Sequence, residues 1–336
     1  MKLVLATHES SLRHDAGRAH PERPDRIPAV VRGIVGTRIP IHQLSPEPAS
    51  LELLASVHSP AYLEDLRDFC ADGGGALDVD TFAGVDSWEA ALRAAAAGPL
   101  VCDSLREGHG ELGYVAMRPP GHHALRDRAM GFCLLNNVAV TARYLTGGGS
   151  RVAIVDWDVH HGNGTQQVFY QDPAVLYLSI HQAGIYPGTG SLSDAGEGAG
   201  LGTNLNIAVP SHTGGAFYRR ALAEVLAPII SQFEPDWLLV SSGYDAHAAD
   251  PLASLRLGAA DYGAMANMLA PLVPAGRAVV FLEGGYDLDA LEESAAATVQ
   301  GWLDSTYAVD PDTSGLDPDG YLQRAQEVAA LYWQLD

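Results

Sequence analysis

Three ionisable residues alternate with apolar ones in the segment Asp156-Trp157-Asp158-Val159-His160. In an extended chain this spacing places the three polar side chains on one side, where they crowd one another. Burying such groups together is costly unless a cation holds them. The spacing therefore indicates that Asp158 and His160 bind a divalent metal ion, whereas Asp156 either serves a second cation or orients a neighbouring histidine. A solvated loop with coincidental polarity explains this segment alone equally well.

Asp245 is the best candidate for a third metal ligand, because it lies just beyond a strongly apolar run. A catalytic zinc ion typically has three protein ligands and leaves one position for water. Two carboxylates and one neutral imidazole would balance the metal charge and leave zinc able to polarise both a carbonyl group and a water molecule. Taken alone, Asp245 is more typical of a helix cap or a turn, so the prediction depends on the other two ligands.

Two adjacent histidines, His122 and His123, follow a Pro-Pro-Gly turn. Imidazole groups titrate close to neutrality, so a pair of them beside a metal ion is suited to proton transfer. A carboxylate partner would keep one ring charged, whereas a neutral partner would leave the other ring free to carry a proton. A surface pair of histidines without a catalytic role is the alternative.

Tyr286 follows two glycines that permit a tight turn at the end of an apolar run. A tyrosyl hydroxyl aimed at a bound carbonyl group would stabilise the negative charge that develops on its oxygen. Without the other motifs, an aromatic ring packed under a loop would be the simpler interpretation.

The elements that position these residues alternate along the chain. Short apolar runs rich in β-branched residues indicate buried strands, and the longer amphipathic stretches between them indicate helices. Such alternation predicts an α/β architecture, with a mainly parallel sheet covered by helices on both faces. The predicted strands are residues 3–6, 112–116, 152–155, 175–180, 237–240 and 278–282, and the predicted helices are residues 88–105, 132–145, 217–233, 262–272 and 321–335.

The polar candidates follow the apolar runs instead of being scattered along the chain. In open α/β sheets, ligands bind beyond the carboxyl ends of the strands. Segments that follow five separate predicted strands therefore deliver their side chains to one rim, where we expect a single site.

The composition limits the classes of function. The 336 residues are 47% hydrophobic and carry a formal net charge of −21, a globular composition that disfavours nonspecific binding to nucleic acid. The acidic surface favours cationic substrates such as lysine side chains or polyamines, although it also serves solubility. No apolar run is long enough to span a membrane, and the first residues are typical of a strand instead of a signal peptide. Cys70, Cys102 and Cys133 are too widely spaced for a thiolate metal site, which suits a reducing cytoplasm.

Six short motifs lie between residues 118 and 286. They are Arg118-Pro-Pro-Gly-His-His-Ala124, Gly131-Phe132-Cys133, Asp156-Trp-Asp-Val-His-His-Gly-Asn-Gly-Thr165, Tyr186-Pro-Gly-Thr-Gly190, Gly243-Tyr-Asp245 and Glu283-Gly-Gly-Tyr286. With the earlier segment His20-Pro-Glu-Arg-Pro24, they resemble the histone deacetylase and acetylpolyamine amidohydrolase superfamily, in family order. The resemblance is closest to a class II-like bacterial histone deacetylase-like amidohydrolase. It implies the arginase-deacetylase fold, a single eight-stranded parallel sheet flanked by helices on both faces, and one catalytic domain over residues 1–336.

The resemblance implies which groups bind the metal and transfer protons. His123 would be the general base that activates water and then protonates the leaving amine. Asn163 beside it is the class II residue, since class I enzymes have Asp at that position. The other implied roles are zinc ligation by Asp158, His160 and Asp245, electrostatic support by His122 with Asp156, and polarisation of the acetyl carbonyl by Tyr286.

The resemblance also implies a substrate tunnel and a structural cation. Phe132 and Tyr186 match the two aromatic walls of an acyl-lysine tunnel, which favour a slim methylene stem with its charge left outside. Arg23 resembles the arginine that lines the acetate-release channel. The remaining implied contacts are Gly131, Leu252 and Asp80 for the substrate, and Asp156, Asp158, His160, Ser179 and Ile180 for one K⁺ or Na⁺ ion, several of them through backbone carbonyls.

The sequence thus predicts zinc-dependent hydrolysis of an N-acetyl or short N-acyl amide, with release of acetate and a free amine. The sequence does not decide whether the substrate is an acetylated lysine peptide or protein or an acetylated polyamine. By the resemblance, the polyamine-selective class II enzyme has Glu at the position of Leu252, where lysine deacetylases have Leu. Leu252 therefore argues against selection of polyamines by that Glu, but not against polyamines as such. A ureohydrolase related to arginase would need more bridging carboxylates near Asp156 and Asp245. A catalytically silent acyl-lysine binding module is a further alternative, against which the retained catalytic residues argue. Homo-oligomerisation also stays open.

Overall fold

A central sheet of eight strands organises the chain, and the computed structural model describes residues 1–17, 19–307, 317 and 320–335. Every neighbouring pair of strands in this sheet is parallel, which confirms the predicted eight-stranded parallel sheet. From one edge to the other, the strands are β2 (Ile41–Leu44), β1 (Leu3–Ala6), β5 (Leu112–Val115), β10 (Ala278–Leu282), β9 (Trp237–Ser242), β6 (Val152–Asp156), β7 (Val175–Gln182) and β8 (Asn204–Val209).

Both faces of the sheet are buried, because strand residues alternate between two hydrophobic clusters. In β1, Leu3 and Leu5 belong to one cluster, whereas Val4 and Ala6 belong to the other. Successive side chains of a strand point to opposite faces of its sheet, so each strand contributes to both clusters. A parallel sheet covered on both faces is expected to have such continuous apolar strands.

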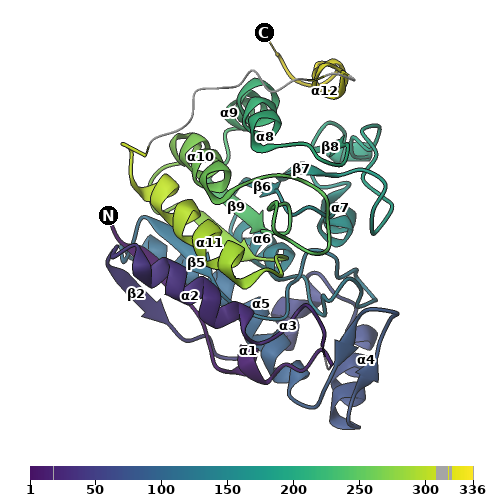
Figure 1. Cartoon of the computed structure of the whole chain (residues 1–336). Coiled ribbons are helices and arrows are strands. Elements are labelled where there is room, and N and C mark those ends of the chain that lie inside the picture. The colour runs from purple at the N-terminus through teal and green to yellow at the C-terminus, as the bar shows by residue number, and fades with distance from the viewer. Residues whose placement is uncertain (18, 308–316, 318–319, 336) are drawn as a thin grey trace.

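Two helical layers cover the sheet (Figure 1). The first layer packs on the face that carries Leu3 and Leu5, and the second packs on the face that carries Val4 and Ala6. The first consists of α2 (Arg26–Gly36), α8 (Gly215–Ala221), η2 (Leu222–Leu226), α9 (Ala227–Phe233), α10 (Ala259–Leu269), α11 (Leu288–Leu303) and α12 (Tyr321–Ala329). The second consists of α3 (Leu51–Ala55), α4 (Pro60–Ala71), α5 (Ser87–Arg106), α6 (Asn137–Gly147) and α7 (Asn163–Phe169). The remaining elements are α1 (Ser10–Arg13), the hairpin of β3 (Gly75–Ala76) and β4 (Phe82–Ala83), η1 (Gly198–Gly200) and η3 (Ala270–Leu272).

Two predicted helix boundaries are wrong. The helix expected from residue 132 begins at Asn137, because the side chain of Asn136 accepts the backbone N–H of Ala139 at 3.0 Å and caps the first turn. The preceding residues form a tight turn instead, in which Phe132 has a φ of 67°. The helix expected to extend to residue 335 ends at Ala329, after which Trp333 donates its indole N–H to the carbonyl of Gly202 at 2.8 Å.

Sequence reasoning missed the two edge strands. In β2 the residues are half-buried or exposed, and two of its four residues are the polar His42 and Gln43. In β8, Asn204 and Asn206 interrupt the apolar pattern with buried amide side chains. Edge strands pair on one side only, so they need not be continuously apolar.

The helices and the cysteines bear on where and how the chain folds. None of the helices in the described ranges is long and apolar enough to cross a membrane. Cys70, Cys102 and Cys133 are all buried and free.

The central strands bring their carboxyl ends to one rim. β6 and β9 are adjacent in the sheet, and β10 lies beside β9. The segments that follow these strands begin with Trp157, Gly243 and Glu283, so the candidate residues of three motifs meet there although they are far apart in sequence.

Candidate active site

The three residues predicted as zinc ligands converge at this rim. One side-chain ligand atom from each of Asp158, His160 and Asp245 lies within 4.8 Å of the other two. Nδ1 of His160 is 3.2 Å from Oδ1 of Asp158 and 3.2 Å from Oδ2 of Asp245. Both carboxylates are buried. Among the described residues, these three form the one cluster with the donors and spacing of a metal site.

Backbone amides from neighbouring strand ends hold the two carboxylates in place. Oδ2 of Asp158 accepts the N–H of Gly284 at 2.8 Å, and Oδ1 of Asp245 accepts the N–H of Val159 at 2.9 Å. A β-carbon at Gly284 would collide with the carboxylate of Asp245, so glycine is required for this close approach. The loops after β6, β9 and β10 therefore fix the cluster together.

The electrostatics of the cluster fit a divalent cation. Burial raises the pKa of Asp245, and the nearby charge of Asp158 raises it further. Although burial opposes its charged form, His160 has a pKa raised to about 10 by Asp158 and Asp245. A positive charge between the two buried carboxylates would favour their ionised forms, and a bound metal ion would supply it. Two carboxylates, one imidazole and an adjoining cavity are the donor set and open position typical of catalytic zinc.

His122 and His123 have opposite surroundings although their ring centroids are only 4.0 Å apart. Nδ1 of His122 lies 3.1 Å from Oδ2 of Asp156, whereas Nδ1 of His123 lies 2.7 Å from Oδ1 of Asn163. An amide oxygen can only accept a hydrogen bond, so His123 carries its proton on Nδ1 and keeps a free lone pair on Nε2.

The charges of the two rings follow from these partners. Burial opposes a charge on His122, but Asp158 and Asp156 raise its pKa to about 10. Burial lowers the pKa of His123 well below its usual range, and the neighbouring His122 and His160 lower it further. The arrangement therefore places a cationic imidazole beside a neutral one.

Asp156 holds His122 from the end of β6. Its carboxylate also accepts the hydroxyl of Tyr177 at 3.1 Å and the backbone N–H of Asp158 at 3.2 Å. Ser179 and Ile180 lie in β7, where Ser179 is paired in register with Asp156. The predicted K⁺ or Na⁺ site at these residues stays a prediction.

A cavity of about 250 Å³ opens beside the metal cluster and the two histidines. The ring of Phe132 stands perpendicular to that of Tyr286 at 5.7 Å, and Tyr186 stands perpendicular to His123 at 5.1 Å. Aromatic rings thus form much of a narrow slot. The residues that line it are Asp80, Pro120, His122, His123, Gly131, Phe132, His160, Tyr186, Leu252, Gly284 and Tyr286, which include every predicted tunnel residue.

The placement of Arg23 at the site is wrong. Its side chain is 49% exposed and forms an ion pair of 3.9 Å with Asp25, which is also exposed. The inward-facing arginine is Arg26, the first residue of α2, whose guanidinium carbon lies 5.1 Å from the ring centroid of Tyr286. Nε of Arg26 donates to the carbonyl of Gly285 at 2.6 Å. The chain turns into α2 between these two arginines, so only the second points toward the sheet.

Two buried carboxylates support the site and were missed as functional candidates. Glu283 accepts the backbone N–H groups of Gly121 and His122, at 2.7 and 3.2 Å. Asp250 accepts the backbone N–H of Tyr286 at 2.7 Å. Burial raises the pKa of each carboxyl group to about 7. Glu283 begins one of the six motifs and Asp250 lies two residues before Leu252, but nothing in their spacing indicated that they bind backbone amides.

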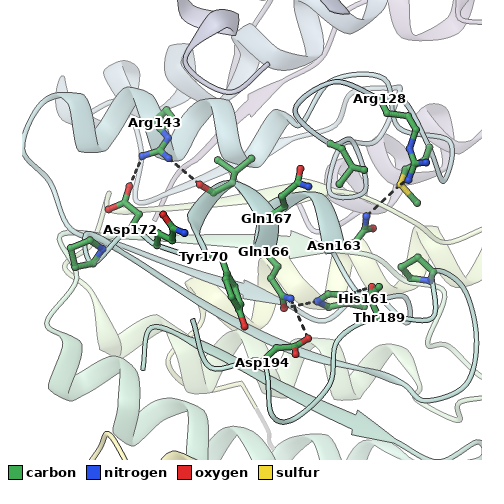
Figure 2. Close-up of a pocket in the computed structure, with 16 residues that line it drawn as sticks. Arg128, Arg143, His161, Asn163, Gln166, Gln167, Tyr170, Asp172, Thr189 and Asp194 are labelled. Atoms are coloured by element: carbon green, nitrogen blue, oxygen red, sulfur yellow. Dashed lines mark hydrogen bonds and ion pairs between the residues drawn. The ribbon is translucent and has the colours of Figure 1, made fainter. Parts of the chain in front are cut away.

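A second cavity, of about 940 Å³, is larger than the one beside the metal cluster and has Asn163 in its lining (Figure 2). Met130 and Pro187 line it, whereas their chain neighbours Gly131 and Tyr186 line the smaller cavity. Nδ2 of Asn163 donates to Sδ of Met130 at 3.4 Å across this wall. Asn163 therefore lines the larger cavity, whereas His123, which its amide contacts, lines the smaller one, and no sequence feature indicated this arrangement.

A family model described as the histone deacetylase domain matches residues 20–302. The chain belongs to the histone deacetylase family. The HD domain of HDA15, known from a crystal structure, superimposes with a TM-score of 0.90 at 33% identity, covering 98% of this chain and 96% of that one. This match confirms the arginase-deacetylase fold that the sequence predicted.

Curated relatives of this histone deacetylase family member include a plant protein and a bacterial protein. Histone deacetylase 10, chloroplastic, from Oryza sativa subsp. japonica is 40% identical over 309 residues, covering 85% of this chain and 70% of that protein. The histone deacetylase-like amidohydrolase of Pseudomonas aeruginosa is 39% identical over 278 residues, covering 81% of this chain and 73% of that protein. Family membership supports a hydrolase of the deacetylase and amidohydrolase type. Two plant relatives are named chloroplastic, so the predicted cytoplasmic location stays a prediction.

Proposed function

We propose that the protein is a zinc-dependent amidohydrolase that removes an acetyl or similar short acyl group from a lysine side chain or related amine. The observation that carries the proposal is the position of His123, whose Nδ1 lies 2.7 Å from Oδ1 of Asn163 and whose ring lines the same cavity as His160 of the metal cluster. Zinc held by Asp158, His160 and Asp245 would polarise the amide carbonyl and lower the pKa of a water molecule.

The residues around the cavity divide the proton transfers between them. Nε2 of His123 takes a proton from the attacking water and then gives it to the nitrogen of the leaving amine. His122 stays cationic beside Asp156 and stabilises the negative charge that develops nearby. Burial raises the pKa of Tyr286 well above its usual range, so its hydroxyl stays protonated and can donate a hydrogen bond to the oxyanion.

The shape of the cavity supports a slim, neutral acyl-amine stem. Phe132 and Tyr186 present aromatic surfaces to that stem, and Leu252 adds an apolar side chain that is 41% exposed. Asp80 places a carboxylate in the same lining, where it suits either the backbone N–H groups of a lysine peptide or the ammonium group of an acetylated polyamine. Acetylpolyamine hydrolysis at the same site is therefore the second candidate.

Further parts of the proposal concern the setting of the site. We propose a structural K⁺ or Na⁺ ion at Asp156, Asp158, His160, Ser179 and Ile180, supported by the adjacent positions of Asp156 and Ser179 in β6 and β7. We also propose that residues 1–336 form one catalytic domain that acts in the cytoplasm. Part of its last segment lies outside the described residues.

Steady-state kinetics on three substrate classes would test the proposal. We expect the zinc-loaded protein to hydrolyse an acetyl-lysine peptide, an acetylated polyamine or a longer acyl-lysine peptide, and the ratio of their kcat/KM values would identify the substrate class. The variant Asp245→Asn, assayed in parallel, should lose both zinc and activity. Zinc-replete wild-type protein that hydrolyses none of the three would refute the proposal and favour a silent binding module.

A further inference from the structure

The hairpin of β3 and β4 forms part of the wall of the smaller cavity. Its tip is residues 77–81, and its turn closes on the carbonyl of Thr81, which accepts the N–H groups of Leu77 and Asp78 at 2.7 and 3.2 Å. Val79 at the tip is 90% exposed, whereas Thr81 is fully buried. A polar side chain buried at the base of an exposed tip needs hydrogen-bond partners.

The hydroxyl of Thr81 joins two parts of the cavity lining. Its oxygen accepts the backbone N–H of Phe132 at 3.0 Å, and its proton is donated to Oδ1 of Asp80 at 3.0 Å. These two bonds use one lone pair and the single proton of the hydroxyl, so they form at the same time. The aromatic wall and the carboxylate of the cavity are thus linked through one atom.

His20 reinforces the same link from the opposite direction. Its Nδ1 accepts the N–H of Glu22 at 3.1 Å, so its proton resides on Nε2, which donates to the carbonyl of Asp80 at 3.1 Å. The edge of its ring also meets Phe132, with centroids 4.5 Å apart and planes at 79°.

The backbone of Phe132 explains why such anchoring is needed. Its φ of 67° follows Gly131 at 56°, and the turn is closed by the reciprocal backbone hydrogen bonds of Met130 and Cys133. A left-handed conformation is unfavourable for a residue with a β-carbon and persists only where the surroundings enforce it. The bond from Phe132 N–H to Thr81 is a contact that can enforce it from outside the turn.

We propose that Thr81 is a positioning residue, which locks the strained aromatic wall at Phe132 to the carboxylate of Asp80. The inference rests on the proposed amide hydrolysis and extends it. One hydroxyl sets the spacing between the group that contacts the acyl-amine stem and the group that contacts the rest of the substrate. The slot is therefore formed before the substrate arrives.

Kinetics of Thr81→Val, with Thr81→Ser as the matched control, would test this role. Valine keeps the shape of threonine but lacks the hydroxyl, whereas serine keeps the hydroxyl. We expect Thr81→Val to raise KM about three- to tenfold, the loss typical of one hydrogen bond, and to leave kcat within about twofold. Thr81→Ser should restore KM, and zinc content should match the wild type in both variants.

Two substrates would separate the wall from the carboxylate. Thr81→Val should raise KM for both an acetyl-lysine peptide and an N-acetylated alkylamine, which offers the stem alone. Asp80→Asn should raise KM for the peptide only. In the Thr81→Val background, Asp80→Asn should cost less than it does alone, because the carboxylate has already lost its anchor.

Amide hydrogen exchange provides a measure that is independent of catalysis. The N–H of Phe132 should exchange about tenfold faster in Thr81→Val than in the wild type or Thr81→Ser. Unchanged exchange, or an unchanged KM for both substrates in an active enzyme, would overturn the role of Thr81. If the zinc-loaded wild type hydrolysed neither substrate, the proposed function would be refuted. The exchange rate of the Phe132 N–H would still decide whether Thr81 is a positioning residue.

Discussion

At the scale of single residues, the site depends on how the same side chain behaves beside different neighbours. His122 and His123 are identical in type and adjacent in sequence, yet Asp156 holds one and Asn163 holds the other. A carboxylate stabilises an imidazolium, whereas an amide oxygen fixes a tautomer without favouring charge as strongly. The difference between one carboxylate and one amide therefore decides which ring can accept a proton from water.

Replacing His123 should abolish most of the activity without removing the metal. We expect His123→Ala to lower kcat about 100- to 10,000-fold, because the water would lose its positioned base. Zinc content, measured by elemental analysis, should be unchanged, since His123 is not among the three clustered donors. The control His109→Ala removes a side chain that is 43% exposed at the far end of β5 and should leave kcat unchanged. A kcat loss below tenfold would contradict the assigned role.

Replacing Tyr286 tests the oxyanion contact separately. Tyr286→Phe keeps the ring that faces Phe132 but removes the hydroxyl. We expect kcat to fall about 100- to 1,000-fold, as when one donor is removed from an oxyanion hole. Binding of an uncleaved substrate analogue, measured by calorimetry, should change much less. Equal losses in binding and in kcat would point to a packing role instead.

Residue types and spacing predicted that Asp158 and His160 lie together, because alternate residues of an extended segment point to the same side. The arginine beside Tyr286 was missed for the opposite reason. Arg23 and Arg26 flank a turn into α2, and which of them faces inward depends on where that helix begins. A difference of three residues in a short loop cannot be judged from residue type alone.

At the scale of elements, a buried ionic network joins the segment before α2 to the ends of β5 and β10. Glu22 pairs with both Arg26 and Arg118, and all three side chains are fully buried. Arg26 also donates to the backbone carbonyls of Glu283 and Gly285. Although burial opposes the charge of Glu22, Arg118 lowers the pKa of its carboxyl group well below the usual range.

Neutralising the carboxylate of this network should destabilise the fold strongly. Glu22→Gln leaves two buried guanidinium groups without their anion, which we expect to lower the free energy of unfolding by about 3–5 kcal/mol. Urea denaturation would measure this. The control Arg32→Gln breaks an exposed ion pair with Glu292 and should cost less than about 1 kcal/mol. Similar losses in both variants would contradict the prediction.

A buried neutral histidine should make stability depend on pH. Nδ1 of His58 donates to the carbonyl of Leu125, and Nε2 accepts the N–H of Asn136, both at 2.9 Å. Burial lowers the pKa of His58 from 6.5 to about 4, so the folded state binds fewer protons than the unfolded state between these values. Its contribution to the free energy of unfolding is present in full above pH 6.5. This contribution falls by a total of about 3 kcal/mol as the pH decreases from 6.5 to about 4.

Comparison with His58→Gln would isolate this effect. Unfolding free energies of the variant, measured between pH 7 and about pH 4.5, should fall less steeply than those of the wild type. Parallel pH profiles for the two proteins would show that His58 does not contribute to the acid sensitivity.

The elements that sequence reasoning placed correctly are those whose burial is nearly complete. Six central strands and the helices with strong periodicity were predicted within a few residues. The helix after the second motif was placed too early because Phe132 and its neighbours are apolar, although the cap at Asn136 decides the boundary. The edge strands β2 and β8 were missed because they contain polar residues. An edge strand pairs on one side only, so it need not be continuously apolar as the central strands are.

At the scale of the whole molecule, the metal cluster ties together strands that are remote in sequence. Asp158 follows β6 and Asp245 follows β9, and the amide of Gly284 that follows β10 contacts Asp158. Parallel topology, which the alternation of strands and helices predicted, makes this convergence necessary. The strand order itself was not predictable, because local patterns do not specify which strands pair.

Removing the metal should lower the stability of the entire fold. Without a metal ion, only His160 lies between the buried carboxylates of Asp158 and Asp245, and the charge of Asp158 still disfavours the ionised form of Asp245. Free zinc at 100 times its Kd would add about 2.7 kcal/mol to the unfolding free energy, so chelation should lower Tm and added zinc should restore it. Calorimetry with and without a chelator would measure this. Asp245→Asn should respond less to zinc, and a wild-type Tm that is indifferent to chelation would contradict the assignment of the cluster as a metal site.

The strand order of the sheet also has a consequence for how the protein is made. β9 and β10 are synthesised after all the other strands, yet they lie between β5 and β6 at the middle of the sheet. Before residue 237 is made, the native pairings available are those within β2-β1-β5 and within β6-β7-β8, and the facing edges of β5 and β6 have no native partner strand. Unpaired edges of this kind are prone to wrong association. Only β9 and β10 can pair both of these edges in the native order, so the middle of the sheet is the last part that the growing chain can complete.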